Sequence, residues 1–153
     1  MRRLLLLLAT TAATLGAGLV AATPAQAAAP TCTSWTTITP PYAYQEVIHV
    51  PSAGYQTGRL DCVLKRGNRN DAVKVLQRAL RFCHGKGYVE VDGDYGSNTH
   101  LGVWTFQNFW NSHYGAGLVE DGEYGPATRR WMNYVIYTWP ANQQTPWCHE
   151  SPY

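Results

Sequence analysis

The chain has 153 residues, a formal net charge of +2 and four cysteines. Both excess positive charges come from Arg2 and Arg3, so residues 28–153 carry ten basic and ten acidic side chains and no net charge. This balance gives no support to nucleic-acid binding or to a purely electrostatic attraction to an anionic wall or membrane. The remaining length, about 126 residues, is enough for one domain of ordinary size.

Residues 1–27 have the pattern of a secretory signal peptide. A basic start at Arg2 and Arg3 is followed by a mainly apolar run and by the small-x-small cleavage site "AQA", which ends at Ala27. A membrane anchor is the alternative, but the run is short for a span and contains several Thr and Gly. We therefore expect cleavage after Ala27 and a mature protein that is extracellular or associated with the cell wall, with no membrane segment.

Residues 28–61 form a Thr-, Pro- and Tyr-rich segment. The runs "TSWTTIT" and "YQEVIHV" combine β-forming residues with partial alternation, and "PPYA" lies between them. This pattern predicts either a short β-hairpin or an extended arm.

The pattern changes at Cys62 and predicts a first helix within "NDAVKVLQRALRFC". Asn70 or Asp71 can cap its start, and "HGKG" can end it. Its apolar residues follow steps of three, four and three, which places them on one helical face: Val73, Leu76, Leu80 and Cys83.

Two further helices are expected downstream. The second lies in "SNTHLGVWTFQNFW", with Ser97 as its N-cap and with Val103, Phe106 and Trp110 at helical steps. The third lies in "PATRRWMNYVIY", where Pro126 suits the first helical turn. Its buried face would consist of Trp131 or Met132, followed by Val135. Residues 138–153 read as a loop-like tail held by Cys148.

The pattern Asp-Gly-acidic-Tyr-Gly-x-x-Thr occurs twice, as "DGDYGSNT" at 92–99 and as "DGEYGPAT" at 121–128. Asp-Gly is strong turn chemistry, and each threonine could bond back to the aspartate of its own motif. The repeat extends upstream, since "VKVLQ" at 73–77 returns as "VWTFQ" at 103–107. We take the following residues as a structural motif: Asp92, Gly93, Gly96, Thr99, Asp121, Gly122, Gly125 and Thr128.

These elements predict a mainly α fold. It would be a small three-helix bundle over 62–137 with two similar Asp-Gly-x-Tyr-Gly crossovers, preceded by the hairpin or arm and followed by the tail. No metal or other cofactor is expected. A calcium loop starting at Asp92 would lack the required glycine and glutamate, and the Cys-His pairs lack zinc-site spacing.

The cysteines of an exported chain predict two disulfides. In the favoured pairing, Cys62–Cys83 joins two side chains that face the same core. The remaining bond, Cys32–Cys148, then ties the arm to the tail. The alternative pairing is Cys32–Cys62 with Cys83–Cys148.

The ordered motifs over 62–137 resemble the peptidoglycan-binding domain found on many bacterial wall hydrolases. Asn70 departs from that pattern by standing where a second glycine is usual, and the segment between Gln107 and Asp121 looks longer than usual. The matching residues are Leu64, Gly67, Val73, Leu76, Gln77, Asp92, Gly93, Tyr95, Gly96, Thr99, Phe106, Gln107, Asp121, Gly122, Gly125, Pro126 and Thr128.

The resemblance implies a secreted, non-catalytic, monomeric module that binds the stem peptide or glycan of peptidoglycan. The candidate ligand contacts are Tyr95, Trp104, Trp110 and Tyr124, although core packing is the commoner role for both tyrosines. One alternative is a secreted interaction or inhibitor protein on the same scaffold. A peptidoglycan hydrolase is less well supported, because the flanking segments are short and no hydrolase motif is present.

Overall fold

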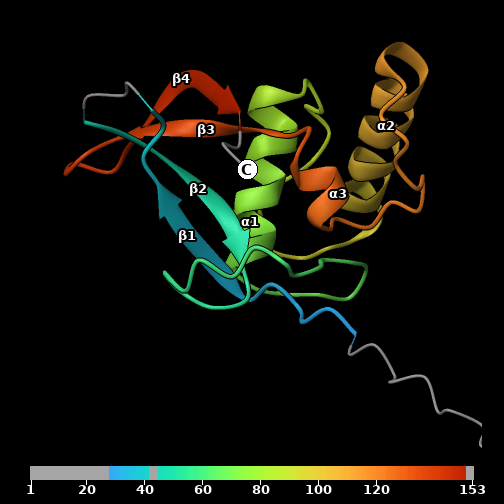
Figure 1. Ribbon diagram of the computed structural model, residues 1–153, viewed down its shortest axis with the longest axis horizontal. Helices are drawn as coiled ribbons and strands as arrows, with labels where there is room; N and C mark the ends of the chain where they lie inside the picture. The colour runs from blue at the N-terminus through green and yellow to red at the C-terminus, as the bar shows by residue number, and fades with distance from the viewer. Residues whose placement is uncertain (1–27, 42–44, 151–153) are drawn as a thin grey trace, which may run out of the picture.

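The computed structural model describes residues 28–41 and 45–150, so the expected signal peptide lies outside the described residues. The chain forms a four-stranded antiparallel sheet and a helical side (Figure 1). The elements are β1 (Ser34–Ile38), β2 (Glu46–Ser52), α1 (Asp71–Arg78), the π-helical segment η1 (Ala79–Cys83), α2 (Ser97–Tyr114), α3 (Pro126–Arg129), β3 (Asn133–Thr138) and β4 (Gln143–Glu150).

The predicted mainly α three-helix bundle is wrong. The strands form one sheet in the order β1-β2-β3-β4, and each neighbouring pair is antiparallel. Within residues 28–41 and 45–150, the substantial helical segments are α1 with its continuation η1, and α2, because α3 has four residues. The expected third helix over 126–137 ends after the single turn of α3, and the segment continues as strand β3.

The sequence of β3, "NYVIYT", explains this error. Its β-branched and aromatic residues fit a pleated surface. The register pairs Ile48 of β2 with Ile136 of β3. The spacing of apolar residues in this segment is compatible with a helix or a strand. Pairing with β2, which is far away in the sequence, makes it a strand. The expected loop-like tail is likewise a strand, β4, which tolerates Pro146 because it forms the edge of the sheet.

The segment expected as a hairpin or arm forms a hairpin, but it is built into the sheet. The register of β1 and β2 runs from Ser34 opposite Ser52 to Ile38 opposite Ile48. Ile48 and Val50 are fully buried in the main core, together with residues of the helical side. The hairpin is therefore part of the folded body rather than a free arm.

The outer edge of β1 is covered by the loop that follows β2. The Gln56 backbone N–H donates to the Trp35 carbonyl at 2.9 Å. The Gln56 side chain completes the cover, since its Oε1 accepts from the Thr37 N–H at 2.9 Å and its Nε2 donates to the Thr37 hydroxyl at 2.6 Å. These contacts satisfy backbone groups that an exposed edge strand would leave open.

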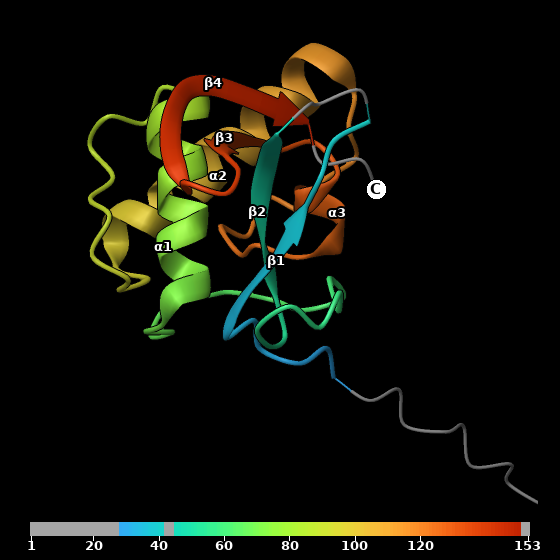
Figure 2. The ribbon, with the colours of Figure 1, turned by 90° about the vertical axis from the view of Figure 1, so that its left-hand side faces the viewer.

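The first helix, α1, and its continuation η1 lie against the sheet. α1 contacts β1 and β2, and η1 contacts β3 and β4. In Figure 1 the sheet lies on the left, α1 and α3 in the middle and α2 on the right. In Figure 2, which views the molecule from the side of the sheet, α1 lies to the left of the β1–β2 hairpin. In the described part of the chain, no helix has both the length and the apolar character needed to cross a membrane.

The disulfides are Cys32–Cys62 and Cys83–Cys148, so the favoured pairing of Cys62 with Cys83 is wrong. The π-helical turn explains the difference, because its wider hydrogen-bonded rings rotate Cys83 away from the face of Leu76 and Leu80. Cys83 instead packs beside Val47, Val135 and Tyr137 on the sheet.

The segments around Cys32 and Cys62 pair through their backbones. The Cys32 N–H donates to the Val63 carbonyl at 3.0 Å, and the Val63 N–H donates to the Pro30 carbonyl at 2.9 Å. This backbone pairing aligns the two neighbouring cysteines for their bond.

Candidate functional site

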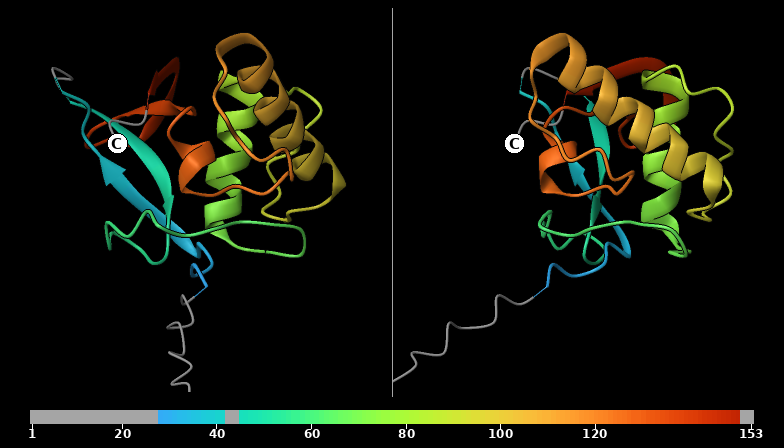
Figure 3. Two further views of the ribbon diagram at one scale, coloured as in Figure 1. Left: turned by 45° about the vertical axis from the view of Figure 1, so that its right-hand side comes forward. Right: turned by 90° about the vertical axis from the view of Figure 1, so that its right-hand side faces the viewer.

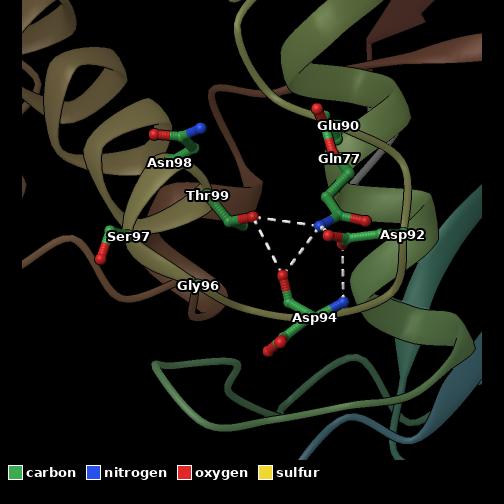
Figure 4. Close-up of a pocket in the computed structure, with 8 residues that line it drawn as sticks. All are labelled: Gln77, Glu90, Asp92, Asp94, Gly96, Ser97, Asn98 and Thr99. Atoms are coloured by element: carbon green, nitrogen blue, oxygen red, sulfur yellow. Dashed lines mark hydrogen bonds between the residues drawn. The ribbon is translucent and has the colours of Figure 1, made fainter.

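The first copy of the repeated turn is organised by Gln77, which reaches it from α1 (Figure 4). Its Nε2 lies 2.7 Å from Asp92 Oδ1, 2.9 Å from the Asp94 carbonyl and 3.0 Å from Thr99 Oγ1. Its Oε1 accepts the Gly93 N–H at 2.8 Å. Gln77 is 1% exposed, so the amide end of each bond is buried, although Asp92 itself is exposed.

The second copy is organised in the same way by Gln107 of α2. Its Nε2 lies 3.0 Å from Asp121 Oδ1, 2.9 Å from the Glu123 carbonyl and 3.2 Å from Thr128 Oγ1. Its Oε1 accepts the Gly122 N–H at 2.9 Å. Each turn is therefore shaped by a glutamine on the helix that precedes it.

Two expectations about these turns need correction. The hydroxyls of Thr99 and Thr128 donate to the carbonyls of Asp94 and Glu123, not to the aspartates that begin the motifs. Ser97 is the first residue of α2 rather than its N-cap, which is Gly96 and makes no side-chain cap bond. The predicted cap of α1 is confirmed at Asn70, whose side chain accepts from the Val73 N–H at 3.1 Å.

Sequence reasoning did not assign a role to the two glutamines. The usable signal was their recurrence, because "VKVLQ" and "VWTFQ" each end in Gln at nearly the same distance before the next Asp-Gly. Buried side-chain amides need hydrogen-bond partners, and the adjacent turn supplies them.

Tyr95 and Tyr124 lie in the core, 1% and 0% exposed. The Tyr95 hydroxyl donates to the Gly122 carbonyl at 2.8 Å, and the Tyr124 hydroxyl lies 2.9 Å from that of Tyr134. Burial raises the pKa of both hydroxyls. Both rings therefore hold the turns in place and present no surface to a ligand.

Each copy of the turn borders a small cavity, and the two cavities differ in lining. The first, about 220 Å³, is lined by Gln77, Glu90, Asp92, Asp94, Gly96, Ser97, Asn98 and Thr99 (Figure 4). The second, about 170 Å³, has Val119, Pro126 and Ala127 at the positions equivalent to Glu90, Ser97 and Asn98.

The first cavity is acidic and the second is largely apolar. In the first, the backbone N–H of Asp94 and the Gln77 amide lower the pKa of the Asp92 carboxyl. The second carboxylate of this turn, Asp94, is paired with Arg69 at 2.9 Å. Most polar groups of the first cavity therefore already have partners within the protein.

The two candidate tryptophans lie on α2, which forms the outer layer of the helical side (Figure 3). Trp104 is 39% exposed. It lies on the same side of the helix as His100 and Asn108, which contact Gly122 and Glu120. Trp104 is therefore available to a ligand that approaches α2 beside the second turn.

Trp110 belongs to an aromatic cluster on the second half of α2. Its ring centroid lies 4.7 Å from Tyr114, 5.1 Å from Trp131 and 5.9 Å from both Phe106 and Phe109. This cluster forms one wall of a cavity of about 330 Å³, which we call the His84 cavity. Its lining residues are Cys83, His84, Lys86, Phe106, Phe109 and Trp110.

His84 is a neutral imidazole fixed by β3. Its Nε2 accepts the Asn133 backbone N–H at 3.0 Å. The Asn133 carbonyl is also 3.2 Å from Nε2, but the backbone N–H can only donate, so Nε2 must be the acceptor. Burial, assisted by the nearby Lys86 charge, lowers the pKa of His84 to about 4.

Residues 28–41 and 45–150 contain no group of three or more His, Cys, Asp or Glu side chains placed to hold a metal ion. All four cysteines are in disulfides. The candidate surface thus consists of aromatic rings, turn backbone and a few polar side chains.

Residues 69–132 match the family described as "Putative peptidoglycan binding domain". The match begins just before α1 and ends just before β3, so it covers both glutamines and both copies of the turn. It confirms the family resemblance seen in the sequence motifs. Comparison with curated proteins and with solved structures gives no match.

Proposed function

We propose that this chain is a secreted, non-catalytic module that binds peptidoglycan through its helical side. The observation that carries the proposal is the family match over residues 69–132, the segment that forms both glutamine-organised turns. The matched family is one of binding domains. The two disulfides fit an oxidising, extracellular location.

The surface of α2 offers contacts of a suitable kind. Trp104 is exposed at 39% and Phe109 at 44%, and Phe109 and Trp110 both line the His84 cavity. Aromatic walls with a few polar groups are typical of sites that recognise small uncharged or amphipathic ligands. Because residues 28–153 carry no net charge, binding should not depend on a long-range electrostatic attraction between the whole protein and the wall.

The test is sedimentation of the purified mature protein with insoluble peptidoglycan. We expect the protein to pellet with the wall material and to release no soluble fragments. Release of fragments would instead identify a hydrolase. A folded protein that stays in the supernatant would favour the alternative role of a secreted interaction or inhibitor protein.

Variants locate the contact surface. Trp104→Ala should weaken sedimentation while keeping the wild-type melting temperature, because this ring is partly exposed. Trp110→Ala should lower both the sedimented fraction and the melting temperature, because the Trp110 ring packs against four other rings. Trp139→Ala is the matched control, since Trp139 is 60% exposed and lies just after β3, at the sheet.

A further inference from the structure

The His84 cavity is separate from the repeated turns. None of its lining residues belongs to 92–99 or 121–128. It lies between the end of η1 and the middle of α2, two elements joined by the loop that carries Lys86. Its volume, about 330 Å³, is at the lower end of the range for small-molecule sites. A group the size of a dipeptide would fill it.

The aromatic walls of the cavity are held in place before any ligand arrives. The His84 ring meets the Phe106 ring edge-on, with centroids 4.7 Å apart. Phe109 meets Trp110 edge-on at 5.9 Å. Trp110 is in turn supported by Trp131 on the far side. Preformed apolar walls of this kind favour a compact apolar group such as a methyl side chain.

The polar groups of the cavity are a hydrogen-bond donor and a cation. Because Nε2 of neutral His84 accepts from Asn133, the proton of the ring is on Nδ1. Within the described residues, His84 Nδ1 has no hydrogen-bond partner. It is also not one of the buried side-chain atoms that lack a partner, so it is accessible to a ligand. No ion pair with Lys86 is found in the same residues.

The His84 N–H and the Lys86 ammonium together favour an anionic ligand. The lining residues include the Lys86 ammonium and the His84 N–H but no carboxylate. A terminal carboxylate can accept from both groups while a neighbouring methyl packs on the rings. Within peptidoglycan, the D-alanyl end of a stem peptide has this composition.

We propose that the His84 cavity binds the free carboxylate end of a D-alanyl stem peptide, with the carboxylate between Lys86 and His84 and the methyl groups against Phe106, Phe109 and Trp110. This deepens the proposed function and rests on it, because it names the part of peptidoglycan that is held.

The probe is a soluble diacetyl-L-lysyl-D-alanyl-D-alanine peptide, compared with the same peptide carrying a C-terminal amide. Binding to the mature protein is measured by titration calorimetry and by NMR shifts of the Trp110 indole and the His84 Nδ1. We expect the acid to bind and to shift both signals. The amide should bind about tenfold more weakly or worse, because it carries no negative charge to pair with the Lys86 ammonium.

Lys86→Met tests the cation, and Phe109→Ala tests the apolar wall. Each should weaken acid binding several-fold or more without loss of fold, since Phe109 is 44% exposed and Lys86 is partly exposed. Lys65→Met, an exposed residue in the loop before α1, is the matched control and should leave binding unchanged. Equal affinity for acid and amide, or wild-type affinity in Lys86→Met, would overturn the proposal.

Sedimentation with insoluble peptidoglycan separates this proposal from the general one. Wall binding without peptide binding would refute the His84 cavity as the stem-peptide site and leave the proposed function intact. Peptide binding with no wall binding would support the cavity and reject the wall-binding function. Binding of a peptide-free glycan fragment with shifts at Trp110 would show that the cavity recognises sugar instead, and would also overturn the proposal.

Discussion

Gln77 and Gln107 make the same hydrogen bonds from equivalent positions on two different helices. In both, Nε2 faces an Asp carboxylate, the carbonyl two residues later and a Thr hydroxyl, while Oε1 accepts a glycine N–H. An amide carries only two N–H groups, so the three acceptors share them. The shape of each turn therefore depends on the helix before it as well as on its own Asp-Gly.

Replacing one of these glutamines should destabilise the protein. Gln77→Leu keeps the size of the side chain but leaves the buried Gly93 N–H without its acceptor. We expect a loss of about 1–3 kcal/mol in the free energy of unfolding, measured by urea titration. Gln144→Leu, at an exposed position of β4, is the control. A Gln77→Leu protein as stable as this control would contradict the role of the amide.

Gly122→Ala should lower the free energy of unfolding by more than Gly93→Ala does. Both glycines have positive φ, 67° and 83°, so both substitutions carry the left-handed penalty of about 1–2 kcal/mol. At Gly122 a new Cβ would also overlap the His100 ring, whose Nδ1 is held 3.2 Å from the Gly122 carbonyl. At Gly93 the Cβ meets mainly the flexible Lys74 side chain.

A double substitution separates the two effects. Adding His100→Ala to Gly122→Ala should recover part of the lost stability, because it removes the overlap and leaves only the backbone penalty. Thermal melting of the two single variants and the double variant gives the interaction energy. If the stability losses of the two single variants simply add in the double variant, the His100 ring does not contribute to the effect of Gly122→Ala.

Stability should fall as the pH is lowered from about 6.5 to about 4. Burial lowers the pKa of both His49 and His84 from 6.5 to about 4, with a smaller contribution from Arg78 at His49. In this window the unfolded chain binds protons that the folded chain excludes, so their contribution is complete above pH 6.5 and is lost toward pH 4.

His49→Phe tests this directly, because His49 stacks between Trp35 and Tyr137 and a phenyl ring can take the same place. Urea unfolding at a series of pH values should show that the free energy of unfolding of this variant depends less steeply on pH. The same slope in the wild type and the variant would exclude His49 as a source of the pH dependence.

Mild reductant should open Cys83–Cys148 before Cys32–Cys62. Cys32 and Cys62 are fully buried, whereas Cys83 and Cys148 are partly exposed, and thiol exchange requires access to a sulfur. Alkylation under native conditions followed by peptide mass mapping should therefore label Cys83 and Cys148 first. Early labelling of Cys32 would contradict the burial seen here. A linked peptide joining Cys32 to Cys148 would contradict the pairing itself.

The features that could be predicted from the sequence are those set by near neighbours. The Asp-Gly turns, the Asn70 cap and Pro126 at the start of α3 depend on a few adjacent residues, and the motif pattern resembles the family whose model matches residues 69–132. The hairpin strands were also visible, because β-forming residues alternate on both sides of a proline-containing break.

The features that could not be predicted depend on distant partners or on one local irregularity. β3 is a strand because β2 and β4 lie on either side of it, and neither partner is visible in the spacing of its own residues. Cys83 turns toward the sheet because η1 widens the end of the first helix, which an apolar pattern of three and four residues does not reveal. Likewise, the His84 cavity required knowledge of how η1 and α2 approach each other.

The bond from the Tyr95 hydroxyl to the Gly122 carbonyl crosses from the first turn to the second. The Leu64 backbone pairs with Tyr124, and the Asn68 carbonyl accepts the Tyr95 N–H, so the short segment 64–68 contacts both turns. Opening either turn therefore breaks the bond between the Tyr95 hydroxyl and the Gly122 carbonyl, which the two turns share. Amide hydrogens of Gly93 and Gly122 should therefore exchange with solvent at a common rate, set by a single cooperative opening of both repeats.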